Sequence, residues 1–125
     1  MAGYIVNIER ETLTNDNFRK VLHTAGHSQL VVMTLQPGEE IGLEVHDLDQ
    51  FIRIEEGEAK VELDGAESTV SADWAIVIPA GTWHNVINTG AGKLKLYSIY
   101  SPAEHPEGTV HRTKAEADAA EHEHH

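Results

Sequence analysis

Two short stretches of the chain carry side chains that can bind a metal ion. The first contains Glu44 and His46, and Gln50 opens the extended run that follows. Glu44 and His46 are two residues apart, so on a strand both project from the same face. In the second stretch, His84 follows a Pro-Ala-Gly turn at residues 79–81. If the strands that carry these residues close on one another, these side chains converge on a common point.

The composition narrows the chemistry of such a site. The chain has 125 residues and no cysteine, which excludes disulfides, thiolate metal ligands and cysteine nucleophiles. Any bound metal is therefore held by nitrogen and oxygen ligands. Nine Lys plus Arg residues against 21 Asp plus Glu give a net charge of −12, which repels phosphate backbones and anionic lipid surfaces. We therefore expect no nucleic-acid partner.

Length and hydropathy indicate one small domain away from membranes. At 125 residues the chain can form one core but is too short for two. No apolar run approaches the roughly 20 residues that cross a bilayer. The first ten residues have neither the basic flank nor the apolar block of a signal peptide. We expect a cytoplasmic protein with no membrane partner.

The elements that must position these residues are short strands. Residues 4–9 and 29–35 are β-branched runs that predict strands, whereas residues 18–23 are ambiguous. Further short extended runs, separated by turn residues, follow at 41–46, 50–55, 59–63, 67–70, 75–78, 84–88 and 93–100. Asp64-Gly65 is the strongest signal for a tight hairpin turn. This spacing predicts an all-β, antiparallel sandwich or barrel.

The C-terminal region has a different character. Thr113 and Glu116 have the spacing of a capping box before an Ala/Glu-rich run, which predicts a short helix over residues 113–121. We expect the tail at residues 122–125, which contains three histidines, to be disordered. The chain divides into an N-terminal strand and connecting segment (1–28), a β-barrel (29–101) and a C-terminal loop, helix and tail (102–125).

The spacing around the metal-competent residues resembles a known pair of motifs. Gln50 stands seven residues before Gly57, and His46 stands four before Gln50. Farther along, the pattern Pro-x-Gly-x2-His-x3-Asn is formed by Pro79, Gly81, His84 and Asn88. These spacings resemble the two sequence motifs of the cupin superfamily, whose members are small β-barrels of jelly-roll type that usually hold a divalent metal.

The chain departs from the common cupin pattern at three positions. Glu44 stands where the first motif has its first histidine, and Gln50 stands where it has a glutamate. Asp73 takes the place of the first glycine of the second motif. The resemblance covers residues 29–100, and the wider chain is similar to small single-domain cupins of the mannose-6-phosphate isomerase-like type.

The resemblance implies a metal site formed by Glu44, His46, Gln50 and His84. Two imidazoles and one carboxylate make a triad that suits Zn, Mn, Ni or Fe and leaves positions open for water or substrate. The substitution at Glu44 moves the carboxylate without changing its number. Gln50 is neutral, so it is either a weak oxygen ligand or a hydrogen-bonding neighbour that orients a ligand.

Two functions fit this site. The first is a metal-dependent enzyme of isomerase, lyase or dioxygenase type that acts on a small polar or anionic molecule. The alternative is a non-catalytic module that binds a small ligand or a structural metal. No catalytic residue is identifiable, and His105 and His111 have no ligand spacing and receive no role. We also expect a homodimer, because cupins resembling this chain are commonly dimers and a strand at residues 4–8 could pair with a second copy.

Overall fold

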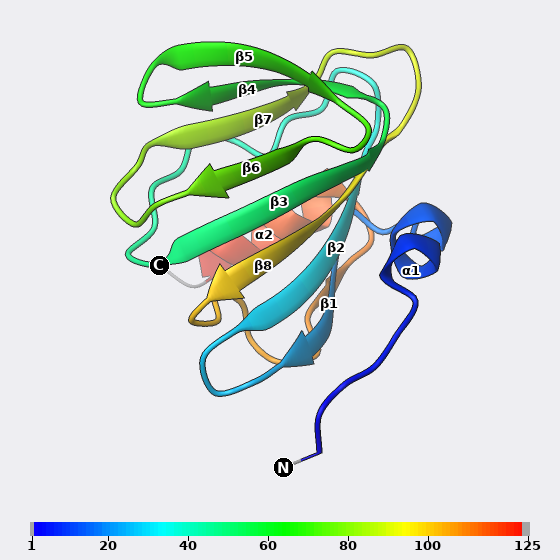
Figure 1. The fold of residues 1–125 in the computed structure, drawn as a ribbon, viewed down its shortest axis with the longest axis vertical. Coiled ribbons are helices and arrows are strands. Elements are labelled where there is room, and N and C mark those ends of the chain that lie inside the picture. Colours follow the sequence, from blue (N-terminus) through cyan, green and yellow to red (C-terminus); the bar gives the residue numbers. More distant parts are fainter. Residues whose placement is uncertain (1, 124–125) are drawn as a thin grey trace.

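The protein folds into two antiparallel sheets, shown in Figure 1 as a computed structural model that describes residues 2–123. The larger sheet has six strands in the order β6-β3-β8-β2-β1-β9, and the smaller has three in the order β5-β4-β7. In chain order the elements are α1 (Ile8–Thr14), β1 (Arg19–Thr24), β2 (Gln29–Leu35), β3 (Asp49–Glu56), β4 (Glu58–Leu63), β5 (Ala66–Ser71), β6 (Ala75–Ile78), β7 (His84–Asn88), β8 (Leu94–Ser101), β9 (Val110–His111) and α2 (Lys114–Glu123). The predicted all-β fold is confirmed in its jelly-roll form, since the two sheets do not close into one barrel.

Alternating side chains of the strands form the core between the sheets. In β3, Ile52 and Ile54 are fully buried, whereas Phe51 and Arg53 are partly exposed on the other face. The same period of two places apolar residues of the other strands in this core, among them Val31, Met33, Leu35, Ala59, Val61, Val86, Leu94 and Leu96. The strands that carry the candidate site are therefore anchored by their inward apolar neighbours.

Two turns have the conformations that their sequences demand. Asp64 and Gly65 both have positive φ, 49° and 86°, and join β4 to β5 in the predicted hairpin. Gly57 lies where the chain passes from β3 in the larger sheet to β4 in the smaller one, with φ of 100°. A Cβ at Gly57 would lie 2.8 Å from the carbonyl oxygen of Lys93, so a side chain there would clash with backbone.

The predicted strand over residues 4–9 is wrong. Residues 4–7 form no strand, and Ile8 begins helix α1. The side chain of Asn7 caps the helix by accepting a hydrogen bond from the backbone N–H of Arg10, and the acids Glu9 and Glu11 lie in the first turn. These local signals outweigh the β propensity of the preceding residues, and the strand edge expected to pair with a second copy is absent.

The first strand of the sheet is instead β1, formed by the run that the sequence left ambiguous. β1 pairs with β2 on one side and with the two-residue strand β9 on the other. The predicted strand over residues 41–46 is irregular and is held by isolated bridges from Glu40 to Ile87 and from Glu44 to His84. This segment therefore follows β7 without extending the smaller sheet.

Helix α2 forms as predicted and is longer than expected. The hydroxyl of Thr113 accepts a hydrogen bond from the backbone N–H of Glu116, and the Glu116 carboxylate accepts one from the backbone N–H of Arg112. The helix lies behind β3 and β8 in Figure 1. It ends at Glu123, so it includes two of the tail residues expected to be disordered, and residues 124–125 lie outside the described residues. Neither helix of residues 2–123 has the length and hydropathy required to cross a bilayer.

Candidate metal centre

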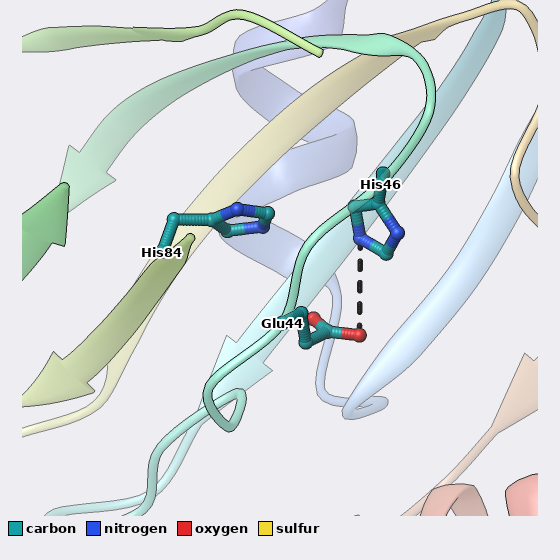
Figure 2. Close-up of side chains that lie close together, drawn as sticks. All are labelled: Glu44, His46 and His84. Atoms are coloured by element: carbon teal, nitrogen blue, oxygen red, sulfur yellow. Dashed lines mark ion pairs between the residues drawn. The ribbon is translucent and has the colours of Figure 1, made fainter. Parts of the chain in front are cut away.

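The structure brings three of the predicted ligands together. One ligand atom from each of Glu44, His46 and His84 lies within 4.8 Å of the others. Figure 2 shows the two imidazoles and the carboxylate extending into one space, with the Glu44 carboxylate facing His46. The ring centroids of His46 and His84 are 5.2 Å apart. A carboxylate and two imidazoles at this separation can share one ion.

Backbone hydrogen bonds set these positions. Glu44 and His84 form a two-way bridge, with N···O distances of 2.9 Å and 2.8 Å, so their side chains project from the same face. The carbonyl of His46 accepts a hydrogen bond of 2.9 Å from the backbone N–H of Gly81, in the turn before His84. The Pro-Ala-Gly turn thus holds the segment that carries His46 against the start of β7.

The alternation predicted for residues 43–46 is found. The side chains of Glu44 and His46 are 26% and 11% exposed, whereas Leu43 and Val45 on the opposite face are 61% and 39% exposed. The polar residues therefore face the interior and the apolar ones face outward. This inversion of the usual pattern indicates that the interior position of Glu44 and His46 serves a purpose other than apolar packing.

His84 presents a lone pair to the interior. It is buried, and its Nδ1 lies 2.9 Å from the carbonyl oxygen of Thr82. A carbonyl only accepts hydrogen bonds, so Nδ1 carries the proton and Nε2 is left with a lone pair. Nε2 is buried and has no hydrogen-bond partner among the described residues. Burial lowers the pKa of the imidazole, which keeps His84 in the neutral form that metals require.

Gln50 is buried on β3, and only the nitrogen of its side-chain amide forms a hydrogen bond among the described residues. Its Nε2 donates a hydrogen bond of 2.9 Å to the hydroxyl of Ser98. Its Oε1 is buried without a partner among the described residues. A buried carbonyl oxygen that forms no hydrogen bond is unfavourable in a resting protein, and a cation or a bound water would satisfy it.

Glu44 is held in a low-dielectric setting. Burial raises the pKa of its carboxyl group, and the nearby charges of His46 and Arg19 act in the opposite direction. An ionised carboxylate here needs a compensating positive charge, which a divalent cation provides. The donor set of imidazole nitrogens, a carboxylate and an amide oxygen therefore fits a divalent transition metal.

Glu104 is a residue that the sequence did not point to. Its carboxylate lies 3.5 Å from Nδ1 of His46, while Nε2 of the same ring lies 3.8 Å from the Glu44 carboxylate. This places a carboxylate behind the imidazole, an arrangement that orients metal-bound histidines. Glu104 follows β8 in a loop, outside both motifs, so no spacing indicated it.

A cavity of about 310 Å³ opens beside Glu44. Its walls come from β1, β9, the loop at residues 104–109 and α2. His105 and His111, which received no role from the sequence, both line it, as does Arg19. The candidate centre thus adjoins a space large enough for a small molecule.

Comparison with known proteins identifies the family. The sequence profile of the cupin domain matches residues 31–100, more than half of the chain. The chain belongs to the cupin family. Proteins of this family often bind metals and small-molecule ligands.

Several known proteins are similar to this chain over most of their length. The uncharacterized protein YrkC of Bacillus subtilis (strain 168) is 54% identical, in a match that covers 94% of this chain and 67% of YrkC. The crystal structure of BH2720 from Bacillus halodurans superposes with a TM-score of 0.93 at 53% identity, over 94% of this chain and 95% of that one. KdgF from Halomonas sp. has a TM-score of 0.65 at 23% identity, over 69% of this chain and 78% of that one, and this likeness concerns the fold alone.

Proposed function

We propose that this cupin is a metal-dependent enzyme that acts on a small polar or anionic molecule. The observation that carries the proposal is a pair of buried polar atoms, His84 Nε2 and Gln50 Oε1, that have no partner among the described residues. His84 begins β7 and bridges Glu44 through the backbone, and Gln50 lies on β3. Buried hydrogen-bond acceptors without a partner are rare in folded proteins, and these two atoms favour a cation bound between them and the Glu44 and His46 pair.

In the proposed centre, His46 and His84 bind the ion through Nε2 and Glu44 binds it through its carboxylate. Gln50 supplies Oε1, either to the ion or to a water on it. A bound divalent ion at such a centre polarises a carbonyl group or activates a water molecule. Zn, Mn, Ni and Fe all suit these donors, and the choice among them selects isomerase, lyase or dioxygenase chemistry.

The protein's own residues would prepare the substrate. The cavity beside Glu44 brings a small molecule next to one ligand of the proposed centre, and residues of α2 form part of the cavity wall. Glu104 holds the His46 ring in place through Nδ1. Tyr100 packs edge-on against His46, and burial raises the pKa of its phenol to about 12, so it stays protonated and is no base at neutral pH.

The remaining predictions about type and assembly stand as parts of this proposal. The mannose-6-phosphate isomerase-like type, a cytoplasmic location and a homodimer all stay predictions. The homodimer no longer has a strand at residues 4–8 to support it and would need another surface.

Metal analysis tests the proposal. The background should be a full-length chain in which His122, His124 and His125 are replaced by alanine, because the tail histidines can bind metal on their own. We expect this protein to hold one equivalent of a divalent metal after loading and desalting. Adding both His46→Ala and His84→Ala should abolish that binding, because two of the three charged or imidazole ligands are lost.

The matched control is His27→Ala, which removes an exposed histidine far from both motifs in the sequence and should leave the metal content unchanged. Retention of a full equivalent by the double variant would contradict the proposed centre. Circular dichroism of each variant would establish that the fold is retained.

The alternative function, a non-catalytic binding module, is favoured by one feature. The Oε1 atom of Gln50 is buried and has no partner among the described residues, and if it binds the ion, the protein supplies four donors, the number that a structural metal site uses. The relaxation rate of water protons in the Mn²⁺-loaded protein separates the two functions. A strong enhancement requires exchangeable water on the ion and supports an enzyme, whereas no enhancement supports the structural role.

A further inference from the structure

One end of the cavity beside Glu44, the basic end, is lined by Arg19, His105 and His111. Arg19, on β1, is buried at 8% exposure, and its guanidinium lies over the Phe18 ring, 5.3 Å from the ring centroid. Its side-chain hydrogen bond runs from Nη1 to Nδ1 of His111, at 3.2 Å. Its Nε is buried and has no partner, and within residues 2–121 no carboxylate forms an ion pair with it. A buried guanidinium without an anion is costly, because removal from water is not compensated.

Three of the four carboxylates that line the same cavity have other partners, and the fourth, Glu121, is exposed and forms no ion pair among the described residues. Asp118 pairs with Lys114 at 2.9 Å, which also accounts for the other basic side chain of the wall. Glu104 faces Nδ1 of His46, and Glu44 belongs to the metal centre. Arg19 is therefore the buried cation of a wall that also carries four carboxylates, and none of them forms an ion pair with it among the described residues.

The charge of Arg19 also affects the pKa values of the two neighbouring histidines. Burial is the main reason that the pKa of His105 falls to about 3, and the charge of Arg19 lowers it further. The pKa of His111 is also lowered, first by burial and then by Arg19. His105 Nε2 is buried without a partner among the described residues, so this end of the cavity offers further unused hydrogen-bonding capacity.

We propose that Arg19, with His105 and His111, binds the carboxylate group of a small oxygenated carboxylic acid whose other end reaches Glu44. The planar guanidinium matches a carboxylate with two parallel hydrogen bonds, and the imidazoles complete the contact. A cavity of about 310 Å³ admits a molecule of a few carbons. The inference rests on the proposed function, since the substrate would join the anion-binding end to the metal end.

The test uses the metal-free, full-length protein, so that carboxylate binding is measured apart from the metal centre. The NMR signal of the Arg19 Nε–H is followed while pyruvate, lactate or malonate is added at millimolar concentrations. We expect at least one of these acids to shift that signal, and the uncharged pyruvamide to leave it unchanged. This readout requires no variant and so does not depend on any variant's folding.

Two substitutions sharpen the measurement. Arg19→Gln should weaken binding of the acid by roughly tenfold or more, and Arg19→Lys should restore part of it by keeping the charge without the planar fork. Arg10→Gln, on the exposed face of α1, should bind as the wild type does.

The proposal is overturned if none of the acids shifts the Arg19 signal, if Arg19→Gln binds as tightly as the wild type, or if pyruvamide binds equally well. Tighter binding of inorganic phosphate than of every acid would contradict a carboxylate ligand. Retention of a full metal equivalent by the His46→Ala/His84→Ala variant in the separate metal analysis, with carboxylate binding at Arg19 intact, would refute the metal centre and leave this site standing.

Discussion

Two neighbouring regions of the molecule, the metal end and the basic end, differ in how they are built. The proposed metal end comprises Glu44, His46 and His84, which the structure brings together, and Gln50 on β3, all within the cupin motifs. The basic end is made by Arg19, a loop after β8, β9 and α2, most of which lie outside the part matched by the cupin profile. We infer that the scaffold shared by the family positions the metal, while the added elements select what reaches it. The two ends should therefore respond separately to substitution.

We expect His84→Ala to cause the largest difference between the effects on metal binding and on carboxylate binding. Removing a metal ligand should lower metal affinity by about a hundredfold or more, because a buried imidazole donor is replaced by an inert methyl group. Carboxylate binding followed at Arg19 in metal-free protein should remain as in the wild type. Competition against a chelating dye measures the first quantity. A variant that lost both properties together would show that the two ends are not independent.

Gln50 should have a smaller effect on the metal end. In Gln50→Ala the free Oε1 is lost, and we expect metal affinity to fall by about tenfold. Gln50→Glu places a charged oxygen at the same point and should raise the affinity instead. Calorimetric titration with Zn²⁺ measures both. Equal affinities for wild type and Gln50→Ala would mean that this oxygen serves neither the ion nor a water on it.

Glu104 lies between the two ends, and its effect should be smaller still. Glu104→Gln removes the charge behind His46 Nδ1, at 3.5 Å, while keeping the shape of the side chain. Since Glu104 is partly exposed, we expect metal affinity to fall by several-fold, at or just below the lower end of the roughly 10- to 100-fold range for such partners. The same titration applies, with Glu107→Gln as the matched exposed control. A change no larger than that of the control would remove Glu104 from the site.

His105, at the basic end, should make the free energy of unfolding depend on pH. The pKa of His105 is about 3 in the folded protein against 6.5 for an ordinary histidine. Between these values the unfolded chain binds a proton that the folded protein does not, so the free energy of unfolding decreases as the pH falls through this window. His105→Phe removes this titration and keeps a ring beside Tyr100.

Urea unfolding at neutral pH and at about pH 4.5 measures the difference. From neutral pH to about pH 4.5, the free energy of unfolding should fall by about 2 kcal/mol more in the wild type than in His105→Phe. This value is already reduced to allow for the partial exposure of the ring. His27→Gln, at an exposed position, should behave as the wild type does. Equal losses in wild type and His105→Phe would show that His105 is not held uncharged by the fold.

Periodicity and turn chemistry account for what could be predicted from the sequence. Strands β3, β4 and β6 alternate between buried and more exposed residues, as strands with one buried face do, and Asp64-Gly65 forms the turn that its sequence predicts. The convergence of Glu44, His46 and His84 followed from their parity and from the motif spacing. These are local signals, because the position of a residue along a strand fixes the face from which its side chain projects.

The rest could not be predicted because it depends on contacts that are distant in sequence or on competition between local signals. Residues 4–9 have β propensity, but the cap at Asn7 begins a helix. Arg19 and His111 meet across 92 positions of the chain, and Glu104 reaches His46 from a loop with no motif. Sequence spacing cannot predict such pairs, because only the folded protein brings the residues together.

The most direct test of the central claim is an anomalous difference map from a crystal of the metal-loaded protein, with data collected at the absorption edge of the loaded metal. We expect one strong peak among Glu44, His46 and His84, about 2.0–2.2 Å from Nε2 of each histidine and from a carboxylate oxygen of Glu44. A map with no peak there, or with density only at the tail histidines, would contradict the metal centre.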